Sequence, residues 1–228
     1  EEEITTCVQE AKVWGKWVAA HARSTWSVKQ CVKQGINVIY HASFLDSEAL
    51  DLLDQHRHAH HIAPGLAWLI NTCHNASEYG LTKDVVHKMG YFKELDAAIE
   101  SMRALHKRGV HIMPGGDYGF AWTPHGTNAK DLEYFVKHIG MSNMEALLSA
   151  TVWGAPMMRS TEPLGQIKEG YLADLLLIDG DPLMDITVLQ DRKRILAVMK
   201  DGVFHREPPT LQQRNQPGRT TMPTRWAA

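Results

Sequence analysis

Two short apolar runs decide how this chain folds. Trp17-Val18-Ala19-Ala20 ends at His21, and Ile36-Asn37-Val38-Ile39-Tyr40 ends at His41. The stretch between them, 24–34, has the apolar spacing of a helix and ends at a glycine. A strand, a helix and a second strand joined by short connections predict a parallel βα unit.

The same alternation continues through most of the chain. After position 163 it changes to short apolar runs separated by Gly-Asp-Pro and Asp-Gly turns, which predict a small antiparallel β element on an α/β body. The other expected helices are 3–16, one from Ser47, 94–107, 129–138 and 143–153, with 68–91 irregular or helical, and the other expected strands are 61–63, 110–113, 165–167, 173–178, 195–200 and 203–204.

The overall composition excludes several classes of function. Lys and Arg total 24 against 26 Asp and Glu, so the net charge of −2 does not favour nucleic acid or an anionic membrane as the partner. No apolar run approaches the ~18 residues of a membrane span. Three scattered cysteines, Cys7, Cys31 and Cys73, do not form a disulfide framework and fit a reducing, cytoplasmic setting.

Three residues that can bind metal follow the expected strands: His21, His41 and Asp117. In parallel α/β folds the carboxyl ends of the strands form the binding edge. Imidazole and carboxylate are natural ligands of a cation such as Zn²⁺. Each residue also has a structural alternative, because a histidine after a strand often only makes a hydrogen bond and Asp117 could cap the next segment. Their shared position is what favours the metal site.

These residues lie in segments that resemble the amidohydrolase superfamily, in its imidazolonepropionase-like and Xaa-Pro dipeptidase-like branch. Residues 18–22 and 34–46 resemble two successive strand ends of the family. Gly116-Asp117-Tyr118-Gly119 looks like its Gly-Thr-Asp element, and 164–175 with 179–183 looks like its C-terminal segment. The resemblance covers about residues 1–206 and is carried by 18–22, 34–46, 116–119, 164–175 and 179–183.

The resemblance implies a distorted TIM (β/α)₈ barrel with a small β-sandwich domain. It assigns 1–160 to the C-terminal half of the barrel, strands five to eight, 161–206 to β-sandwich strands, and 207–228 to an extended tail. The family's His-x-His pair and carboxylated lysine, which belong to the first four strands, are not found here. The chain also starts inside an expected helix, so a companion chain or segment carrying strands one to four is expected, and a homo-oligomer as well.

The resemblance also implies roles for the strand-end residues. His21 and His41 would be metal ligands from strands five and six. Asp117 would be a ligand that also takes a proton from the attacking water. The implied cofactor is one or two divalent metal ions, with Zn²⁺ expected, and a bound metal lowers the pKa of its water to about 7. Tyr40 stands where many relatives have glutamate, which changes the surroundings of the ligands.

Other residues near the expected site are weaker candidates. Arg23 could bind a substrate carboxylate with two hydrogen bonds, or be an ordinary surface arginine. His125 lies in the loop after Asp117 and could line the substrate pocket. The four histidines at 56, 58, 60 and 61 suggest a metal cluster, but His56 and His58 are expected at the opposite face. Cys73 shows no partner base for a nucleophile, and Gly115-Gly116 is too short to bind a phosphate.

The function expected from the resemblance is therefore metal-dependent hydrolysis of an amide, peptide, urea or carbamate C–N bond in a small molecule. A deaminase or lactonase of the same superfamily is the enzymatic alternative. A non-catalytic half-barrel scaffold subunit is the alternative from another class, and metal analysis would separate the two classes.

Overall fold

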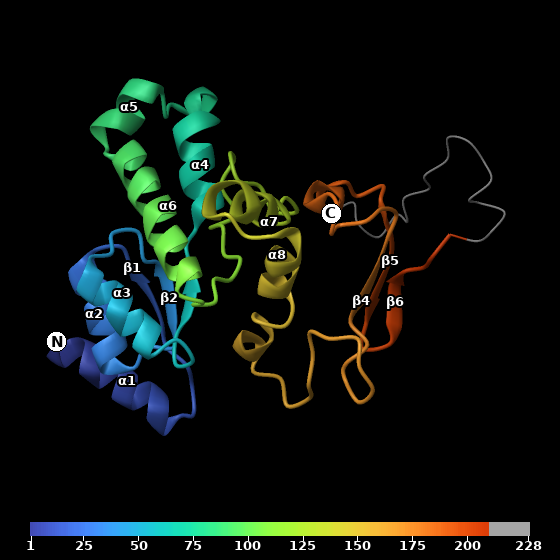
Figure 1. Ribbon diagram of the computed structural model, residues 1–228, viewed down its shortest axis with the longest axis horizontal. Coiled ribbons are helices and arrows are strands. Elements are labelled where there is room, and N and C mark those ends of the chain that lie inside the picture. Colours follow the sequence, from blue (N-terminus) through green and yellow to red (C-terminus); the bar gives the residue numbers. More distant parts are fainter. Residues whose placement is uncertain (210–228) are drawn as a thin grey trace.

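The computed structural model describes residues 1–209 of the 228 in the chain. Most of the extended tail expected over 207–228 therefore lies outside the described residues. The described part is an α/β structure with two separate three-stranded sheets (Figure 1). The α/β class expected from the sequence is confirmed.

The first sheet is parallel and has the order β1-β2-β3. Its strands are β1 (Ala19–Ala22), β2 (Val38–His41) and β3 (His61–Ala63). The strand expected over 110–113 is reduced to a single parallel bridge between Ile62 and Ile112, with a hydrogen bond of 2.8 Å from the Met113 N–H to the Ile62 carbonyl. The next residue, Pro114, has no N–H with which to continue the ladder.

The connections between these strands are helical, as expected. They begin with capping side chains: Ser24 accepts from the Ser27 N–H before α2 (Thr25–Gln34), and Asp46 accepts from the Ala49 N–H before α3 (Ser47–Gln55). Helix α1 (Glu2–Val13) precedes the sheet. Side chains of α2 and α3 then pack with the sheet in one apolar core.

The segment after β3 forms a group of helices that extends beyond the sheet (Figure 1). It is more regular than expected over 68–91, with α4 (Leu66–His74), the 3₁₀ turn η1 (Ser77–Tyr79) and α5 (Lys83–Lys88). Helix α6 (Tyr91–Lys107) begins three residues before the expected start. Fully buried side chains from α4, α6 and the strands, including Leu66, Met102 and Ile39, form the centre of the core.

The remaining helices lead to the second sheet. Helix α7 (Lys130–Tyr134) continues into the π-helical turn η2 (Phe135–Ile139), and α8 (Asn143–Ala150) begins with a Ser142–Glu145 capping box. The 3₁₀ turn η3 (Ala155–Met158) follows. The second sheet is antiparallel in the order β4-β5-β6, with β4 (Leu175–Ile178), β5 (Ile195–Lys200) and β6 (Val203–Arg206), and the turn η4 (Ile186–Gln190) lies between β4 and β5.

One expected strand is wrong. Residues 165–167 form no strand, and Ile167 is 90% exposed. An apolar run becomes a strand only when another strand lies beside it, and in the described residues β4 pairs with β5 alone. Among residues 1–209, no helix is long and apolar enough to cross a membrane.

Candidate active site

The two strand-end histidines meet at the edge of the parallel sheet. His21 lies within β1, opposite Tyr40 in the register, and His41 is the last residue of β2. Their imidazoles approach edge to edge, with 2.7 Å between Nδ1 of His21 and Nε2 of His41. One of these nitrogens donates the hydrogen and the other accepts it. The structure thus brings together the two histidines that the sequence singles out.

His41 sits in a confined and strained position. It is 3% exposed, and its φ of 74° lies in the left-handed region, which costs a non-glycine residue roughly 1–2 kcal/mol. A Cβ at Gly65 would lie 3.1 Å from the His41 ring, so this glycine leaves room for it. Burial lowers the pKa of His41 to about 4, with a further contribution from Arg23, while Asp117 and Glu94 act in the opposite direction. His41 is therefore neutral at pH 7.

Asp117 lies in the loop that follows the Ile112 bridge. Its φ is 58°, and its backbone carbonyl accepts a hydrogen bond of 3.4 Å from Thr123. Its charge raises the pKa of His41, so the carboxylate lies within electrostatic reach of the histidine pair. Across residues 1–209, however, no three His, Cys, Asp or Glu side chains lie close enough together to hold a metal ion.

Arg23, one residue after β1, is held by other side chains of this chain. It forms an ion pair with Glu94 of α6, which is 8% exposed and also accepts a hydrogen bond of 2.9 Å from the Ser43 hydroxyl. The guanidinium also lies over the Trp68 ring, 5.7 Å from its centroid. This arginine is therefore fixed beside the histidine pair. Sequence analysis did not identify Glu94 or Ser43 as partners of Arg23.

An aromatic wall lies next to Arg23. The Trp68 ring packs edge to face against Tyr91 at 5.1 Å and against Phe120 at 5.9 Å. Phe120 in turn packs against Trp122, whose Nε1 donates a hydrogen bond of 3.0 Å to Thr72. These rings come from α4, α6 and the loop after Asp117, so the loop and the helices together provide an apolar surface beside a fixed cation.

His125 does not join the histidine pair in the described contacts. It is exposed, and its ring faces Gly119, where a Cβ would lie 3.2 Å from Nε2. The histidines at 56–61 lie toward the other end of the strands. Nδ1 of His60 is 2.6 Å from the Ile36 carbonyl, and His61 stacks on Trp17 with the ring centroids 5.2 Å apart.

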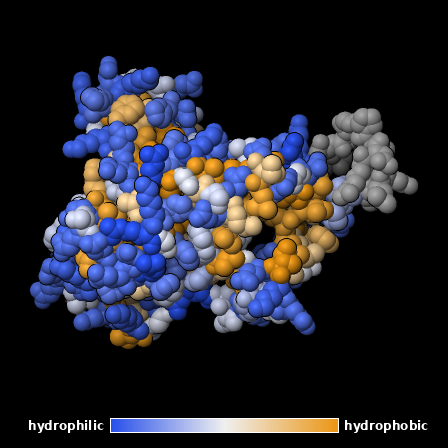
Figure 2. All heavy atoms as spheres, in the orientation of Figure 1, coloured by the Kyte–Doolittle hydropathy of each residue, from blue (hydrophilic) through white to orange (hydrophobic). Residues whose placement is uncertain are grey.

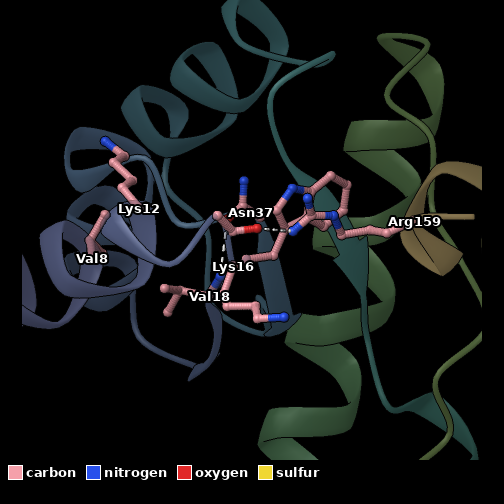
Figure 3. A pocket seen from close by; sticks show the side chains of 8 residues that line it. Val8, Lys12, Lys16, Val18, Asn37 and Arg159 are labelled. Carbon is pink, nitrogen blue, oxygen red and sulfur yellow. Dashed lines mark hydrogen bonds between the residues drawn. The ribbon is translucent and has the colours of Figure 1, made fainter. Parts of the chain in front are cut away.

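A cavity of about 280 Å³ also lies at this other end of the sheet (Figure 3). Asn37 at its wall accepts a hydrogen bond of 3.0 Å from the Val18 N–H, just before β1 and β2 begin. The Arg159 guanidinium donates a hydrogen bond of 2.8 Å to the Gly15 carbonyl and lies over the Trp17 ring. Because ligands of parallel sheets bind at the carboxyl ends of strands, this cavity is not the candidate active site.

The histidine pair has the right chemistry for a divalent metal ion, because neutral imidazoles are preferred zinc ligands. Two nitrogens on one tetrahedral zinc ion are about 3.3 Å apart, given zinc–nitrogen bonds of about 2.0–2.1 Å. From the observed 2.7 Å, the rings of His21 and His41 would part by roughly half an ångström to bind the same ion. The pair supplies two ligands, so the remaining ligands have to come from elsewhere.

Comparisons with known proteins show which family of proteins this chain is similar to. The profile of the amidohydrolase family matches residues 1–204. An ochratoxinase from Aspergillus niger is 29% identical over 208 residues, which are 91% of this chain and 42% of that protein. The chain thus spans less than half the length of the curated relatives it matches.

Two solved structures are similar in fold. A Xaa-Pro dipeptidase with methionine bound in its active site is 31% identical, with a TM-score of 0.78 over 90% of this chain and 48% of that one. The A. niger ochratoxinase structure is 26% identical, also with a TM-score of 0.78, over 90% of this chain and 45% of the ochratoxinase chain.

Proposed function

Because the chain belongs to the amidohydrolase family, we propose that it carries part of the active site of a metal-dependent hydrolase that cleaves a C–N bond. The observation that carries this proposal is the His21–His41 contact of 2.7 Å at the edge of the sheet. The expected bonds are those of amides, peptides, ureas or carbamates. The names of the similar proteins, a dipeptidase and an ochratoxinase, support hydrolysis in general.

We assign a role to each side chain at the sheet edge. His21 and His41 would hold one or two divalent ions, with Zn²⁺ expected, and Asp117 would be the carboxylate ligand. A bound metal ion supplies a water of lowered pKa and polarises the scissile carbonyl. Asp117 accepts the proton of the attacking water and returns it to the leaving amine, a transfer that contributes about 10²–10⁴-fold.

Arg23 and the aromatic wall would bind the substrate. The ion pair with Glu94 and the stacking on Trp68 hold the guanidinium in place without covering all of it, because the Arg23 side chain keeps 36% of its exposure. A substrate carboxylate could accept hydrogen bonds from its free N–H groups. His125 is our second substrate-binding candidate, from the loop after Asp117.

The barrel assignment belongs to this proposal as well. We propose that β1, β2, β3 and the Ile112 bridge correspond to strands five to eight of a (β/α)₈ barrel, with 1–160 as the barrel half and 161–206 as β-sandwich strands. A companion chain or segment would supply strands one to four and the remaining metal ligands.

Metal stoichiometry and kcat, measured on the same preparations, test the proposed roles. The complete enzyme is loaded with Zn²⁺ and assayed on a panel of amides, dipeptides, ureas and carbamates. We expect His21→Ala and His41→Ala to lose metal and activity together. Asp117→Asn keeps one oxygen ligand but cannot accept a proton, so we expect near-normal metal content with kcat lowered at least ~100-fold. The exposed His58→Ala serves as the matched control.

Four other outcomes would contradict parts of the proposal. Wild-type metal content in both histidine variants would exclude the metal assignment, and a chain that holds no stoichiometric metal would favour the non-catalytic scaffold. Turnover of lactones or amino-heterocycles without cleavage of amides would favour a lactonase or deaminase. A normal kcat in Asp117→Asn would show that another residue accepts the proton, with His125 as the next candidate.

A further inference from the structure

A buried carboxylate lies behind the loop that carries Asp117. Asp131, in the first turn of α7, is 1% exposed. Its Oδ2 accepts a hydrogen bond of 3.0 Å from the backbone N–H of Gly115, two residues before Asp117. Nothing in the metal or substrate roles assigned above uses this side chain. A buried carboxylate requires compensation by hydrogen bonds, so its position calls for a reason.

The loop backbone is pressed against this carboxylate. A Cβ at Gly116 would lie 2.6 Å from Oδ1 of Asp131 and 2.7 Å from the Cβ of Ala67, and would also collide with the Tyr118 ring. A Cβ at Gly115 would lie 2.8 Å from the Cβ of Ala63, at the end of β3. The two glycines therefore let the loop pass between β3, α4 and the Asp131 carboxylate.

The contacts of Asp131 lie on both sides of Asp117. Gly115 donates to Oδ2, and the neighbouring Gly116 N–H and Tyr118 hydroxyl lower the pKa of the carboxylate against the effect of burial, while Oδ1 has no hydrogen-bond partner among the described residues. Asp117 lies between these residues with a φ of 58°. A left-handed conformation costs an aspartate about 1 kcal/mol or more, so the contacts around it must hold it there.

A role in packing alone does not explain this residue. An apolar side chain of similar volume would fill the same space without the cost of burying a carboxylate. Asp131 also has no cationic partner among the described ion pairs. Its hydrogen-bond donor is the Gly115 N–H, and the other groups that lower its pKa belong to the loop and to the start of α4. What the carboxylate specifically supplies is an acceptor for the loop backbone.

We propose that Asp131 is a positioning residue, which holds the 115–118 loop so that the Asp117 carboxylate faces the His21–His41 pair. It touches neither substrate nor metal, and acts on proton transfer only through Asp117. This inference rests on the proposed function, because it takes Asp117 as the proton acceptor.

A double-mutant cycle in the complete, metal-loaded enzyme tests this inference. We expect Asp131→Ala to lower kcat by ~10–100-fold, since a small misplacement of a catalytic group has effects of this size. KM and metal content should stay within about twofold, because His21 and His41 are untouched. Asp131→Asn keeps an acceptor oxygen and should restore most of kcat. In the Asp117→Asn background, Asp131→Ala should change kcat less than about twofold.

A second readout does not depend on activity. Hydrogen exchange over 114–119 should become faster in Asp131→Ala and stay near wild type in Asp131→Asn, because the Gly115 N–H loses its acceptor only in the first variant. Glu133→Ala is the matched control: it lies on the same helix and loses a 2.7 Å hydrogen bond from Gln190, but does not touch the loop. If Asp131→Ala fails to fold, Asp131→Val fills the space without an acceptor.

Two results would overturn the inference. An equal loss of kcat from Asp131→Ala with and without Asp117 would show that its role is only structural, and so would unchanged hydrogen exchange in the loop. If Asp117→Asn alone keeps the wild-type kcat, the proposed function is wrong about Asp117. Faster hydrogen exchange over 114–119 in Asp131→Ala than in Asp131→Asn would still show that Asp131 holds the loop.

Discussion

Glu94 and Asp131 are the two carboxylates buried in the described part of the chain, and their surroundings differ. Glu94 is paired with Arg23 and accepts from Ser43. Asp131 has only neutral N–H and O–H groups around it, so burial raises its pKa to about 6. The first carboxylate fixes a cation of the site, and the second fixes a backbone loop.

The raised pKa of Asp131 predicts a specific pH dependence of stability. The pKa of Asp131 is about 6 in the native state and 3.8 in an ordinary aspartate, so the native state binds the proton more tightly than the unfolded state does. The contribution of Asp131 to the free energy of unfolding is then fully present below about pH 4 and is lost as the pH rises to about 6, in total on the order of 3 kcal/mol. Asp131→Asn should lack this loss.

Urea unfolding of the wild type and Asp131→Asn at pH 4, 5, 6 and 7 measures this effect. The free energy of unfolding of the variant, relative to wild type, should increase with pH over this range. Glu133 is the opposite case, because Lys137 and Gln190 hold its pKa below the ordinary value. Glu133→Gln should therefore become less stable relative to wild type as the pH rises. Parallel curves for Asp131→Asn and wild type would contradict the assignment.

At this scale the sequence predicts the residues that follow strands but not their partners. His21 and His41 can be found because each ends an apolar run. Glu94 lies 71 residues from Arg23, and Asp131 lies 16 residues from Gly115, so both contacts depend on how whole helices dock. For Glu94 there was a weak signal: it precedes the buried Leu95 and Ala98 on one helix, where a charge has to find a partner.

At the scale of elements, the loop after the Ile112 bridge matters most for the site. It follows the sheet edge and brings Asp117 and Phe120 to the same side of the molecule as α4 and α6. Its path depends on Gly115 and Gly116, which have ordinary φ values and are needed for lack of space rather than for backbone freedom. A substitution at Gly116 therefore tests packing alone.

We expect Gly116→Ala to lower the free energy of unfolding by about 1–3 kcal/mol, because the added methyl group collides with Ala67, Asp131 and Tyr118. Gly80→Ala is the matched control. Gly80 has a φ of 84° and no atoms near the Cβ position, so only backbone strain of about 1 kcal/mol is expected. Urea unfolding of both variants measures the difference, and a smaller loss at Gly116 than at Gly80 would contradict the packing described here.

The elements themselves follow the sequence where their stabilisation is local. Helices with good caps, such as α2 and α3, begin within one residue of the expected starts at 24 and at Ser47, where Ser24 and Asp46 cap them. The strand expected over 110–113 is shortened by the adjacent proline, and the one over 165–167 is absent for want of a neighbour. Strand formation depends on partners far away in the chain, and a local pattern does not specify them.

At the scale of the whole molecule, two groups stand out among the large apolar side chains exposed in the described residues. One is the second sheet, where Figure 2 shows hydrophobic residues gathered, among them Leu176, Val203 and Phe204 at 58%, 63% and 46% exposure. The other is the end of α1, where Val13 and Trp14 are 78% and 70% exposed. Apolar surface of this kind is typical of an interface.

The chain leads from the end of α1 at Val13 to β1 at Ala19, which is an edge strand of the first sheet. In the described residues β1 pairs only with β2, so the other side of β1 offers unpaired N–H and C=O groups. Exposed strand edges readily pair with another chain. We therefore propose that a companion chain or segment, or a second copy, covers β1 and the α1 end in the functional state.

Light scattering on the isolated chain tests this last proposal. We expect a mass above the 25.7 kDa of one chain, or poor solubility, because the edge of β1 and Trp14 would be covered only on association. Trp14→Lys places a charge at the α1 end and should reduce association. Met89→Lys, at a side chain that is 54% exposed after α5, should not. A folded, stable monomer of 25.7 kDa that binds metal and hydrolyses its substrate would show that β1 needs no partner, and would place all the ligands of the site within this one chain.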